Sequence, residues 1–203
     1  MNVQYPISGI SRLRIQSDGD GIRTLILVSG CNLRCKYCIN PFTWDGSEQP
    51  QMLTVSEIYN RICIDRPYIL ATNGGITFGG GEPLLYPNLI SEIRHICEQE
   101  MTVYVETSLN VPLKNIETTA EDVDKYYIDI KITDAESYRK YTGGSLATAI
   151  DNLKRLIEIK PTNSVVVRIP QIPGFVDEDK QTDAKETLKS IGVEQFDLFR
   201  YRV

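Results

Sequence analysis

The stretch "SGCNLRCKYCINPFTW", residues 29–44, places three cysteines within eight residues in the order C-x3-C-x2-C. Cys31, Cys35 and Cys38 are three of the five cysteines in a chain of 203 residues. A random scatter of five cysteines would match this spacing in roughly a few sequences per thousand. Three kinds of site use clustered thiols: a zinc site, a disulfide, or an iron–sulfur cluster with one iron left without a protein ligand.

Composition narrows these alternatives. The apolar share of 41% and the charged share of 24% are ordinary for a globular protein. The net charge of −5 argues against a nucleic-acid partner, which requires a basic face. There is no apolar run of membrane-spanning length and no signal-peptide pattern at the N-terminus. We therefore expect a cytoplasmic protein with a single domain over residues 1–203, in which reduced thiols make a disulfide the weakest alternative.

Strand and helix patterns alternate along the chain. Apolar, β-branched stretches predict strands at 22–28, 75–78, 102–106, 126–132, 164–170 and 196–201. Apolar residues at helical spacing predict helices near 54–64, 87–100, 145–159 and 178–191, with shorter ones near 119–124 and 134–141. This alternation predicts an α/β fold with a parallel sheet, and six strands indicate a partial (β/α)6 barrel.

The two remaining cysteines bear on the choice of metal. Cys63 and Cys97 fall on the apolar stripes of their predicted helices, where a free cysteine usually packs as a small core residue. The single histidine, His95, lies two residues from Cys97 and would not share its helical face. A structural zinc site requires four protein ligands, so zinc is less favoured than an iron–sulfur cluster.

The cysteine loop resembles that of the radical S-adenosylmethionine (SAM) superfamily, in which the three thiols follow an apolar strand and an aromatic residue, here Tyr37, precedes the last cysteine. The resemblance implies one 4Fe–4S cluster on Cys31, Cys35 and Cys38, with SAM bound at the open iron. The stretch "GITFGGGEPLL", residues 75–85, resembles the glycine-rich motif of the same superfamily. Glycines there let backbone groups approach a ligand, and Glu82 or nearby carbonyls accept from the ammonium of SAM.

The stretch "DGDGIRTLILVSGCNLRCKYC", residues 18–38, resembles the activating enzymes of glycyl radical enzymes, with Asp20 where that group has proline. In "VYVETS", Glu106 stands where that group usually has aspartate, whereas Thr107 agrees. "YIDIKI" and "VVVRIP" resemble two further strand motifs of the group. These matches imply that the catalytic residues are Lys131, Asp129 and Arg168. They also imply that cofactor contacts come from Tyr37, Cys38, Ile39, Gly80, Gly81, Glu82, Glu106, Thr107, Asp129, Lys131, Arg168 and Tyr201.

The charged residues in the strands also allow a simpler interpretation, in which they bind no ligand. Asp129 and Lys131 alternate along one strand and therefore face the same side, which in an outer sheet would be a surface ion pair of little value. Arg168 lies inside an apolar strand, where a charge is costly unless it is paired. We expect all three to point into the barrel near its C-terminal mouth, with SAM, Glu106 or Asp129 as partners.

The sequence also departs from the family pattern. Ile39 follows the third cysteine where many activating enzymes have histidine, and Tyr201 is followed by Arg202 where a histidine usually contacts SAM. No further cysteine pair lies between Cys38 and Gly79, so we expect one cluster only.

The resemblance implies reductive cleavage of SAM to a 5′-deoxyadenosyl radical, which abstracts hydrogen from a glycine of a partner glycyl radical enzyme. Flavodoxin or ferredoxin would supply the electron. Two alternatives remain open. One is a radical SAM enzyme that acts on a peptide or a small metabolite. The other is a non-enzymatic iron–sulfur or zinc protein, which would leave Asp129, Lys131 and Arg168 without a role.

Overall fold

The computed structural model describes residues 3–200, which form one eight-stranded sheet in the order β3-β1-β2-β4-β5-β6-β7-β8. The strands are β1 (Gln4–Ile15), β2 (Ile22–Val28), β3 (Gln51–Thr54), β4 (Gly75–Gly80), β5 (Thr102–Thr107), β6 (Lys125–Asp129), β7 (Val165–Gln171) and β8 (Gln195–Arg200). From β2 to β8 every pairing is parallel, which confirms the predicted sheet of six parallel strands.

The antiparallel strands β1 and β3 extend this sheet and were not predicted. β1 carries Pro6 and Gly9, its register against β2 shifts twice, and Leu13 has a positive φ of 53°. These irregularities remove the strict alternation by which a strand is recognised in sequence.

The helices are α1 (Val55–Cys63), α2 (Arg66–Ala71), α3 (Pro87–Cys97), α4 (Leu113–Thr119), α5 (Ala135–Thr142), α6 (Leu146–Ile159) and α7 (Glu178–Ser190). α1 begins at a capping box, in which the side chains of Thr54 and Glu57 each accept from the other's backbone N–H. The short helix expected near 119–124 was misplaced, because α4 lies earlier in the chain and ends at Thr119. Among the described residues, no helix is long and apolar enough to cross a membrane.

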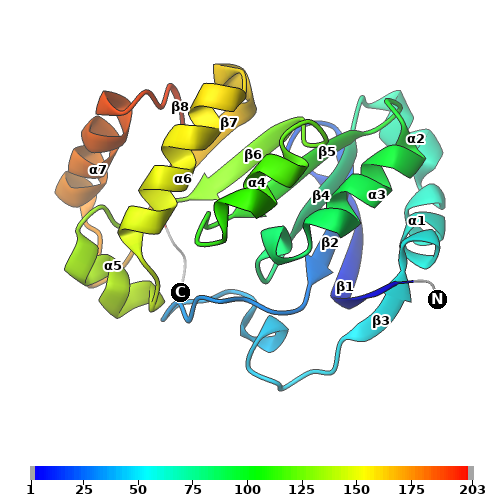
Figure 1. Ribbon diagram of the computed structural model, residues 1–203, viewed down its shortest axis with the longest axis horizontal. Coiled ribbons are helices and arrows are strands. Elements are labelled where there is room, and N and C mark those ends of the chain that lie inside the picture. The colour runs from blue at the N-terminus through cyan, green and yellow to red at the C-terminus, as the bar shows by residue number, and fades with distance from the viewer. Residues whose placement is uncertain (1–2, 201–203) are drawn as a thin grey trace.

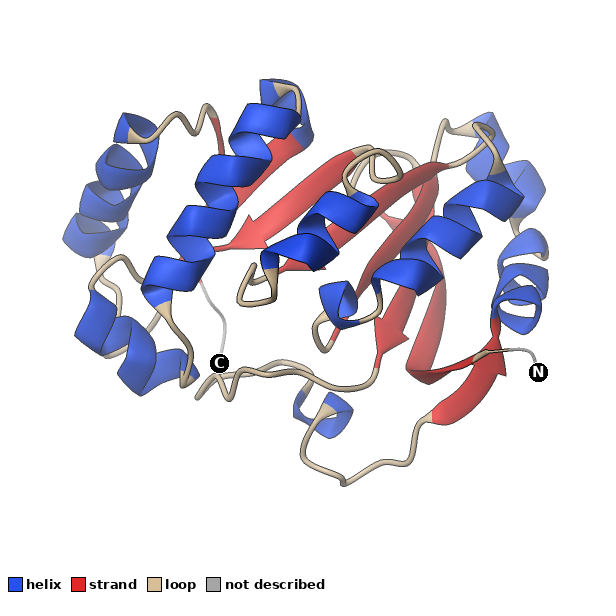
Figure 2. Ribbon diagram, viewed as in Figure 1, coloured by secondary structure: helices blue, strands red, loops and turns tan. Residues whose placement is uncertain are grey.

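The helices pack along one face of the curved sheet (Figure 2), and the apolar core fills the space between the two layers. The loop after β2 runs along the lower side of the molecule in Figure 1, from the end of β2 towards α5, and then returns to β3. The chain therefore brings the cysteine loop across the edge where the carboxyl ends of the parallel strands meet.

Candidate active site

A cavity of about 360 Å³ lies at the carboxyl ends of the parallel strands, beneath the cysteine loop. Its wall contains each predicted site residue that the structure describes: Cys31, Cys35, Tyr37, Cys38, Ile39, Gly80, Gly81, Glu82, Glu106, Thr107, Asp129, Lys131 and Arg168. The remaining predicted residue, Tyr201, lies outside the described residues. Residues from loops and strands far apart in sequence therefore meet at one place, as expected for a site at the mouth of a parallel barrel.

The cysteine loop is fixed by backbone hydrogen bonds to the end of α5. The N–H of Arg34 donates to the carbonyl of Thr142 at 2.7 Å, and the N–H of Lys36 donates to that of Tyr141 at 3.0 Å. These bonds hold the loop against the end of α5. Within the loop, the N–H of Cys38 donates to the carbonyl of Cys35 at 3.2 Å and closes the turn that joins the last two cysteines.

Two N–H groups point at the thiols themselves. The backbone N–H of Leu33 lies 3.4 Å from Cys31 Sγ, and the indole N–H of Trp44 lies 3.4 Å from Cys38 Sγ. Donors of this kind stabilise a thiolate and tune the potential of a cluster bound to it. Trp44 was not among the predicted site residues, although it lies within the same stretch of sequence.

The thiols fit a multi-iron cluster. Burial raises the pKa of Cys31 to about 12 and also raises the pKa of Cys35, so both thiols need a cationic partner to ionise. Among residues 3–200, no three cysteine, histidine or carboxylate side chains converge closely enough to hold a single metal ion. In a 4Fe–4S cluster each thiolate binds a different iron, so three thiols around one cavity satisfy it without such convergence.

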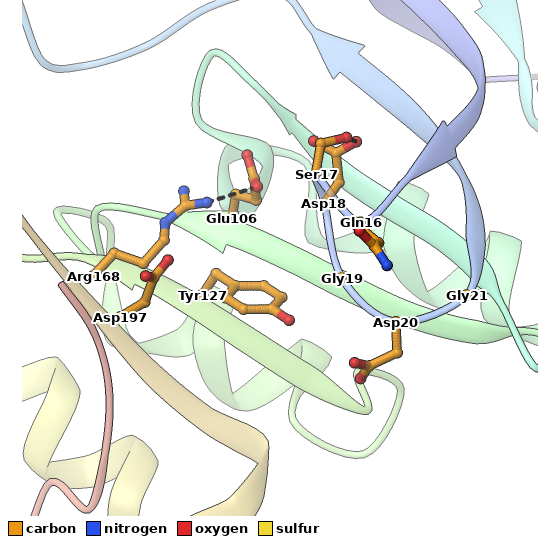
Figure 3. A pocket seen from close by; sticks show the side chains of 10 residues that line it. All are labelled: Gln16, Ser17, Asp18, Gly19, Asp20, Gly21, Glu106, Tyr127, Arg168 and Asp197. Atoms are coloured by element: carbon orange, nitrogen blue, oxygen red, sulfur yellow. Dashed lines mark hydrogen bonds and ion pairs between the residues drawn. The ribbon is translucent and has the colours of Figure 1, made fainter. Parts of the chain in front are cut away.

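An ion network lies opposite the thiols. The guanidinium of Arg168 donates to Glu106 and to Asp129, each at 2.8 Å, and Lys131 Nζ lies 3.0 Å from the second oxygen of Asp129. These four side chains are 17–26% exposed and border the cavity, so Asp129 and Lys131 are not a surface pair. Figure 3 shows Arg168 and Glu106 facing each other.

The network sets the charge of each member. Burial opposes ionisation of Asp129, but Arg168 and Lys131 outweigh it and hold the pKa of Asp129 well below its usual range. For Glu106 burial is the stronger effect, and its pKa is raised despite the contact with Arg168. We expected Lys131 to reach SAM or Glu106, and in the structure Glu106 is instead bonded by Arg168.

Glu82 in the glycine-rich motif is 1% exposed and holds the loop that follows β5. Its carboxylate accepts from the hydroxyl of Thr107 at 2.7 Å and from both the N–H and the hydroxyl of Ser108 at 2.9 and 2.7 Å. The N–H of Leu84 is a fourth donor. These bonds give Glu82 a positioning task, and its predicted contact with the ammonium of SAM stays a prediction.

The glycines of this motif allow two backbone segments to approach closely. A Cβ on Gly81 would lie 2.1 Å from the carbonyl oxygen of Gly30, and Gly80 has a φ of +93°. The N–H of Glu82 then donates to the same carbonyl of Gly30 at 2.8 Å. The motif therefore ties the end of β4 to the root of the cysteine loop, in addition to lining the cavity.

Asn110 is a buried residue of the site region that the sequence did not reveal. Its amide donates to the hydroxyl of Tyr138 at 2.6 Å and accepts from the N–H of Ser145 at 2.8 Å, while Asn32 of the cysteine loop donates to its carbonyl. It thus joins the loop after β5, the cysteine loop, α5 and the start of α6. A lone asparagine in a loop carries no pattern that predicts such contacts.

Comparison with known proteins assigns the chain to a family. Residues 25–185 match the Radical SAM superfamily, which covers more than half of the chain. The pyruvate formate-lyase-activating enzyme of Clostridium pasteurianum is 33% identical, over 86% of this chain and 69% of that protein. The indoleacetate decarboxylase activating enzyme of Tractidigestivibacter scatoligenes is 29% identical, over 82% of this chain and 73% of that protein.

Solved structures share the fold at low sequence identity. QueE from Escherichia coli is 13% identical with a TM-score of 0.59, over 98% of this chain and 84% of that one. SuiB from Streptococcus suis, bound to S-adenosylmethionine, is 13% identical with a TM-score of 0.66, over 85% of this chain and 39% of that one. The chain belongs to the radical SAM superfamily, whose members bind a 4Fe–4S cluster and SAM.

Proposed function

We propose that this radical SAM protein activates a glycyl radical enzyme by abstracting a hydrogen atom from a glycine of that partner. The observation that carries the proposal is the cavity itself, where three thiols of one loop face the network of Arg168, Glu106, Asp129 and Lys131. The names of the two relatives, both activating enzymes, support the choice of partner.

Each side of the cavity has its own task. When bound, the cluster and SAM supply a 5′-deoxyadenosyl radical after one-electron reduction. Cys31, Cys35 and Cys38 hold the cluster at the cavity wall. Lys131 and Arg168 present positive charge to the carboxylate of SAM, and Asp129 and Glu106 keep Arg168 oriented.

The source of the electron is part of the proposal. A flavodoxin or a ferredoxin is the expected one-electron donor, because the chain's described residues offer no second group of thiols for another cluster. Placement in the cytosol and the absence of nucleic-acid and membrane partners stay predictions from composition.

The test is anaerobic reconstitution with iron and sulfide. We expect about four irons per chain, and release of 5′-deoxyadenosine from SAM when dithionite is the reductant. Added pyruvate formate-lyase should then develop a glycyl electron-spin doublet. Cys38→Ser should lose iron and product, whereas Cys63→Ser serves as the matched control and should keep both. One zinc per chain, or iron without SAM cleavage, would contradict the proposal.

A further inference from the structure

Trp44 is the single tryptophan of the chain, and it lies beside the cysteine loop instead of in the apolar core. It is half-buried and forms part of the wall of the cysteine cavity. The indole N–H is directed at Cys38, with 3.4 Å between Nε1 and Sγ. A neutral thiol is a weak acceptor, whereas a charged acceptor makes a much stronger hydrogen bond. The donor therefore suits Cys38 as a thiolate, which is the form that binds metal.

The backbone around Trp44 is tied to the start of the cysteine loop. Trp44 directly follows the one-turn helix Pro41–Thr43. The carbonyl of Thr43 accepts from the N–H of Gly30 at 2.6 Å and from the hydroxyl of Ser29 at 3.1 Å. Because these bonds join the two ends of the segment that contains the cysteines, the position of the indole is fixed by contacts that involve none of the three thiols.

Arg34 covers the ring of Trp44. Its guanidinium carbon lies 4.7 Å from the centre of the indole, which is a cation–π contact. The same guanidinium donates to the carbonyls of Cys31 and Leu33, at 2.5 and 2.7 Å. Since these acceptors are neutral, the positive charge stays uncancelled by them and lies beside the cysteine loop. Arg34 thus holds the indole against the loop from the side of the first cysteine.

We propose that Trp44 raises the reduction potential of the cluster by donating its indole N–H to the sulfur of Cys38, with Arg34 holding the ring in place. This inference rests on the cluster of the proposed function and not on the partner protein. Reduction takes one electron from an external donor such as dithionite, and it breaks no bond and needs no proton. It adds one negative charge to the cluster and its thiolates, so a hydrogen bond to sulfur stabilises the reduced form more than the oxidised form.

The two donors to the cysteine sulfurs differ in what a substitution can remove. The N–H of Leu33, 3.4 Å from Cys31 Sγ, belongs to the backbone and persists whichever non-proline side chain stands at that position. The N–H of Trp44 is lost with its side chain. Variants at position 44 therefore change one hydrogen bond to the thiolates while the other stays constant.

The first test removes the indole N–H alone. Incorporation of 3-benzothienylalanine at position 44 keeps the two fused rings and their contact with Arg34, but puts sulfur in place of the N–H. We expect the iron content of the parent and a midpoint potential lower by about 59 mV, which is a tenfold change in a one-electron equilibrium constant. Potentiometric titration, followed by the electron-spin signal of the reduced cluster, measures it. An unchanged potential with full iron content would overturn the proposal.

Two ordinary substitutions give a matched pair. Trp44→Phe removes the same donor and should lower the potential to a similar extent. Phe42→Leu alters an aromatic side chain of the preceding one-turn helix that does not border the cavity, and it should keep the potential of the parent. An equal fall in Phe42→Leu would assign the effect to loosening of the segment and overturn the proposal. Loss of the cluster from both variants at position 44 would do the same, because Trp44 would then only hold the loop together.

The hydrogen bond also has a direct spectroscopic signature. Because the chain has one tryptophan, ¹⁵N-labelled indole marks Trp44 alone. Electron–nuclear double resonance of the reduced cluster should show coupling to this nitrogen and to a proton that exchanges in D₂O. Trp44→Phe should lack both. Their absence from the parent would show that the indole does not bond to the cluster.

These measurements need no partner protein, which separates this inference from the proposed function. If the parent has the potential and couplings expected but forms no glycyl radical on pyruvate formate-lyase, the proposed function fails and the role of Trp44 stands. If the parent forms the glycyl radical and its potential does not depend on the indole N–H, only the role of Trp44 fails.

Discussion

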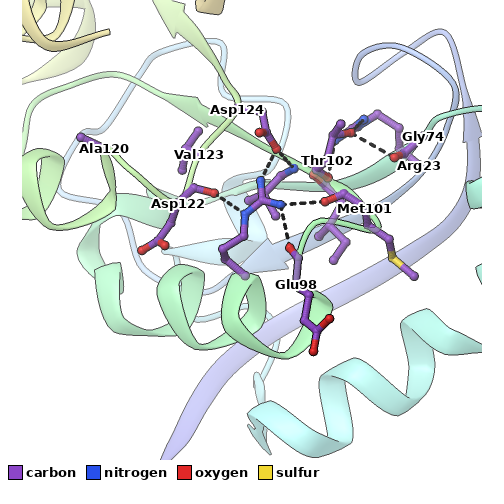
Figure 4. Close-up of polar contacts among 12 residues, drawn as sticks. Arg23, Gly74, Glu98, Met101, Thr102, Ala120, Asp122, Val123 and Asp124 are labelled. Carbon is purple, nitrogen blue, oxygen red and sulfur yellow. Dashed lines mark hydrogen bonds and ion pairs between the residues drawn. The ribbon is translucent and has the colours of Figure 1, made fainter.

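The two ends of the parallel strands each contain an arginine that is largely shielded from solvent, and the two arginines are held by different kinds of partner. At the amino ends Arg23 is 0% exposed and donates to the hydroxyls of Thr77 and Thr102, at 2.7 and 2.8 Å, and to the carbonyl of Ile76 at 2.6 Å. Figure 4 shows Arg23 beside Thr102 at this end. At the carboxyl ends Arg168 is 17% exposed and its bonds go to two carboxylates.

The difference shows how position and partners separate a structural charge from a functional one. Burial among neutral acceptors lowers the pKa of Arg23 to about 10, and the ring of Tyr104, 3.6 Å from its guanidinium carbon, covers it further. Burial also disfavours the charge of Arg168, but Asp129 and Glu106 outweigh it and raise its pKa. Arg23 has no free donor directed to a cavity, whereas Arg168 borders two.

Arg168→Met should have the largest effect of any change at the two ends. It leaves Glu106 and Asp129 facing the cavity without their cation, and removing one partner of a buried ion network costs about 3–5 kcal/mol. We expect normal cluster assembly and a loss of SAM affinity of at least about a hundredfold, measured by titrating SAM into the reconstituted protein. Arg168→Lys should recover part of the affinity, since it restores the charge without the two-pronged geometry. Unchanged SAM binding in Arg168→Met would mean that Arg168, like Arg23, has only a structural role.

Arg23→Met should act on stability instead of on SAM. The substitution leaves the carbonyl of Ile76 and the hydroxyl of Thr77 without their donor, and we expect a loss of about 3 kcal/mol in the free energy of unfolding. Urea unfolding of the apoprotein is the measurement. At a temperature where the variant is folded, its iron content and SAM affinity should equal those of the parent. A fall in SAM affinity with unchanged stability would remove the distinction between the two ends.

Lys131→Met sharpens the comparison within the carboxyl end. It keeps the apolar stem and deletes one charge, while Arg168 still holds Asp129. Loss of one charge-assisted hydrogen bond costs about 1.5–3 kcal/mol, so SAM affinity should fall roughly ten- to a hundredfold with the cluster intact. Asp129→Asn should cause a similar loss, because Lys131 and Arg168 both lose a partner. SAM titration followed by the yield of 5′-deoxyadenosine measures both; parent-like values would leave Arg168 as the only important cation.

The site was more predictable from sequence than the antiparallel strands β1 and β3 at one edge of the sheet. Cysteines at fixed spacing, a glycine-rich strand exit and charges inside apolar strands all mark a site, because each is costly or rare without a ligand. The six parallel strands followed from their apolar runs. Arg168 was expected to need carboxylate partners, and Glu106 and Asp129 provide them.

The missed features depend on contacts between distant residues. β1 is irregular enough to lack a strand pattern, and its register is set by pairing with β2. Glu82 was interpreted by its motif alone, whereas its bonds to Thr107 and Ser108 depend on how two adjacent strands end. Cys97 lies on the buried stripe of α3, as the sequence indicated, but the neighbouring Ile96 is 37% exposed, because an apolar pattern in sequence does not fix the width of the buried stripe.

The smallest expected effect concerns the two cysteines outside the site, which the sequence placed on buried helical stripes. The structure separates them, because Cys97 at the end of α3 is 1% exposed, whereas Cys63 at the end of α1 is half-buried. Cys97→Ser puts a hydroxyl into the apolar core and should cost about 1–2 kcal/mol in the free energy of unfolding. Cys63→Ser should cost less than about 0.5 kcal/mol, since its side chain keeps contact with water. Urea unfolding at constant m-value measures both costs, and the iron content of both variants should equal that of the parent. Loss of iron from either variant would add a thiol outside the cysteine loop to the cluster, and the site would no longer be confined to the carboxyl end of the strands.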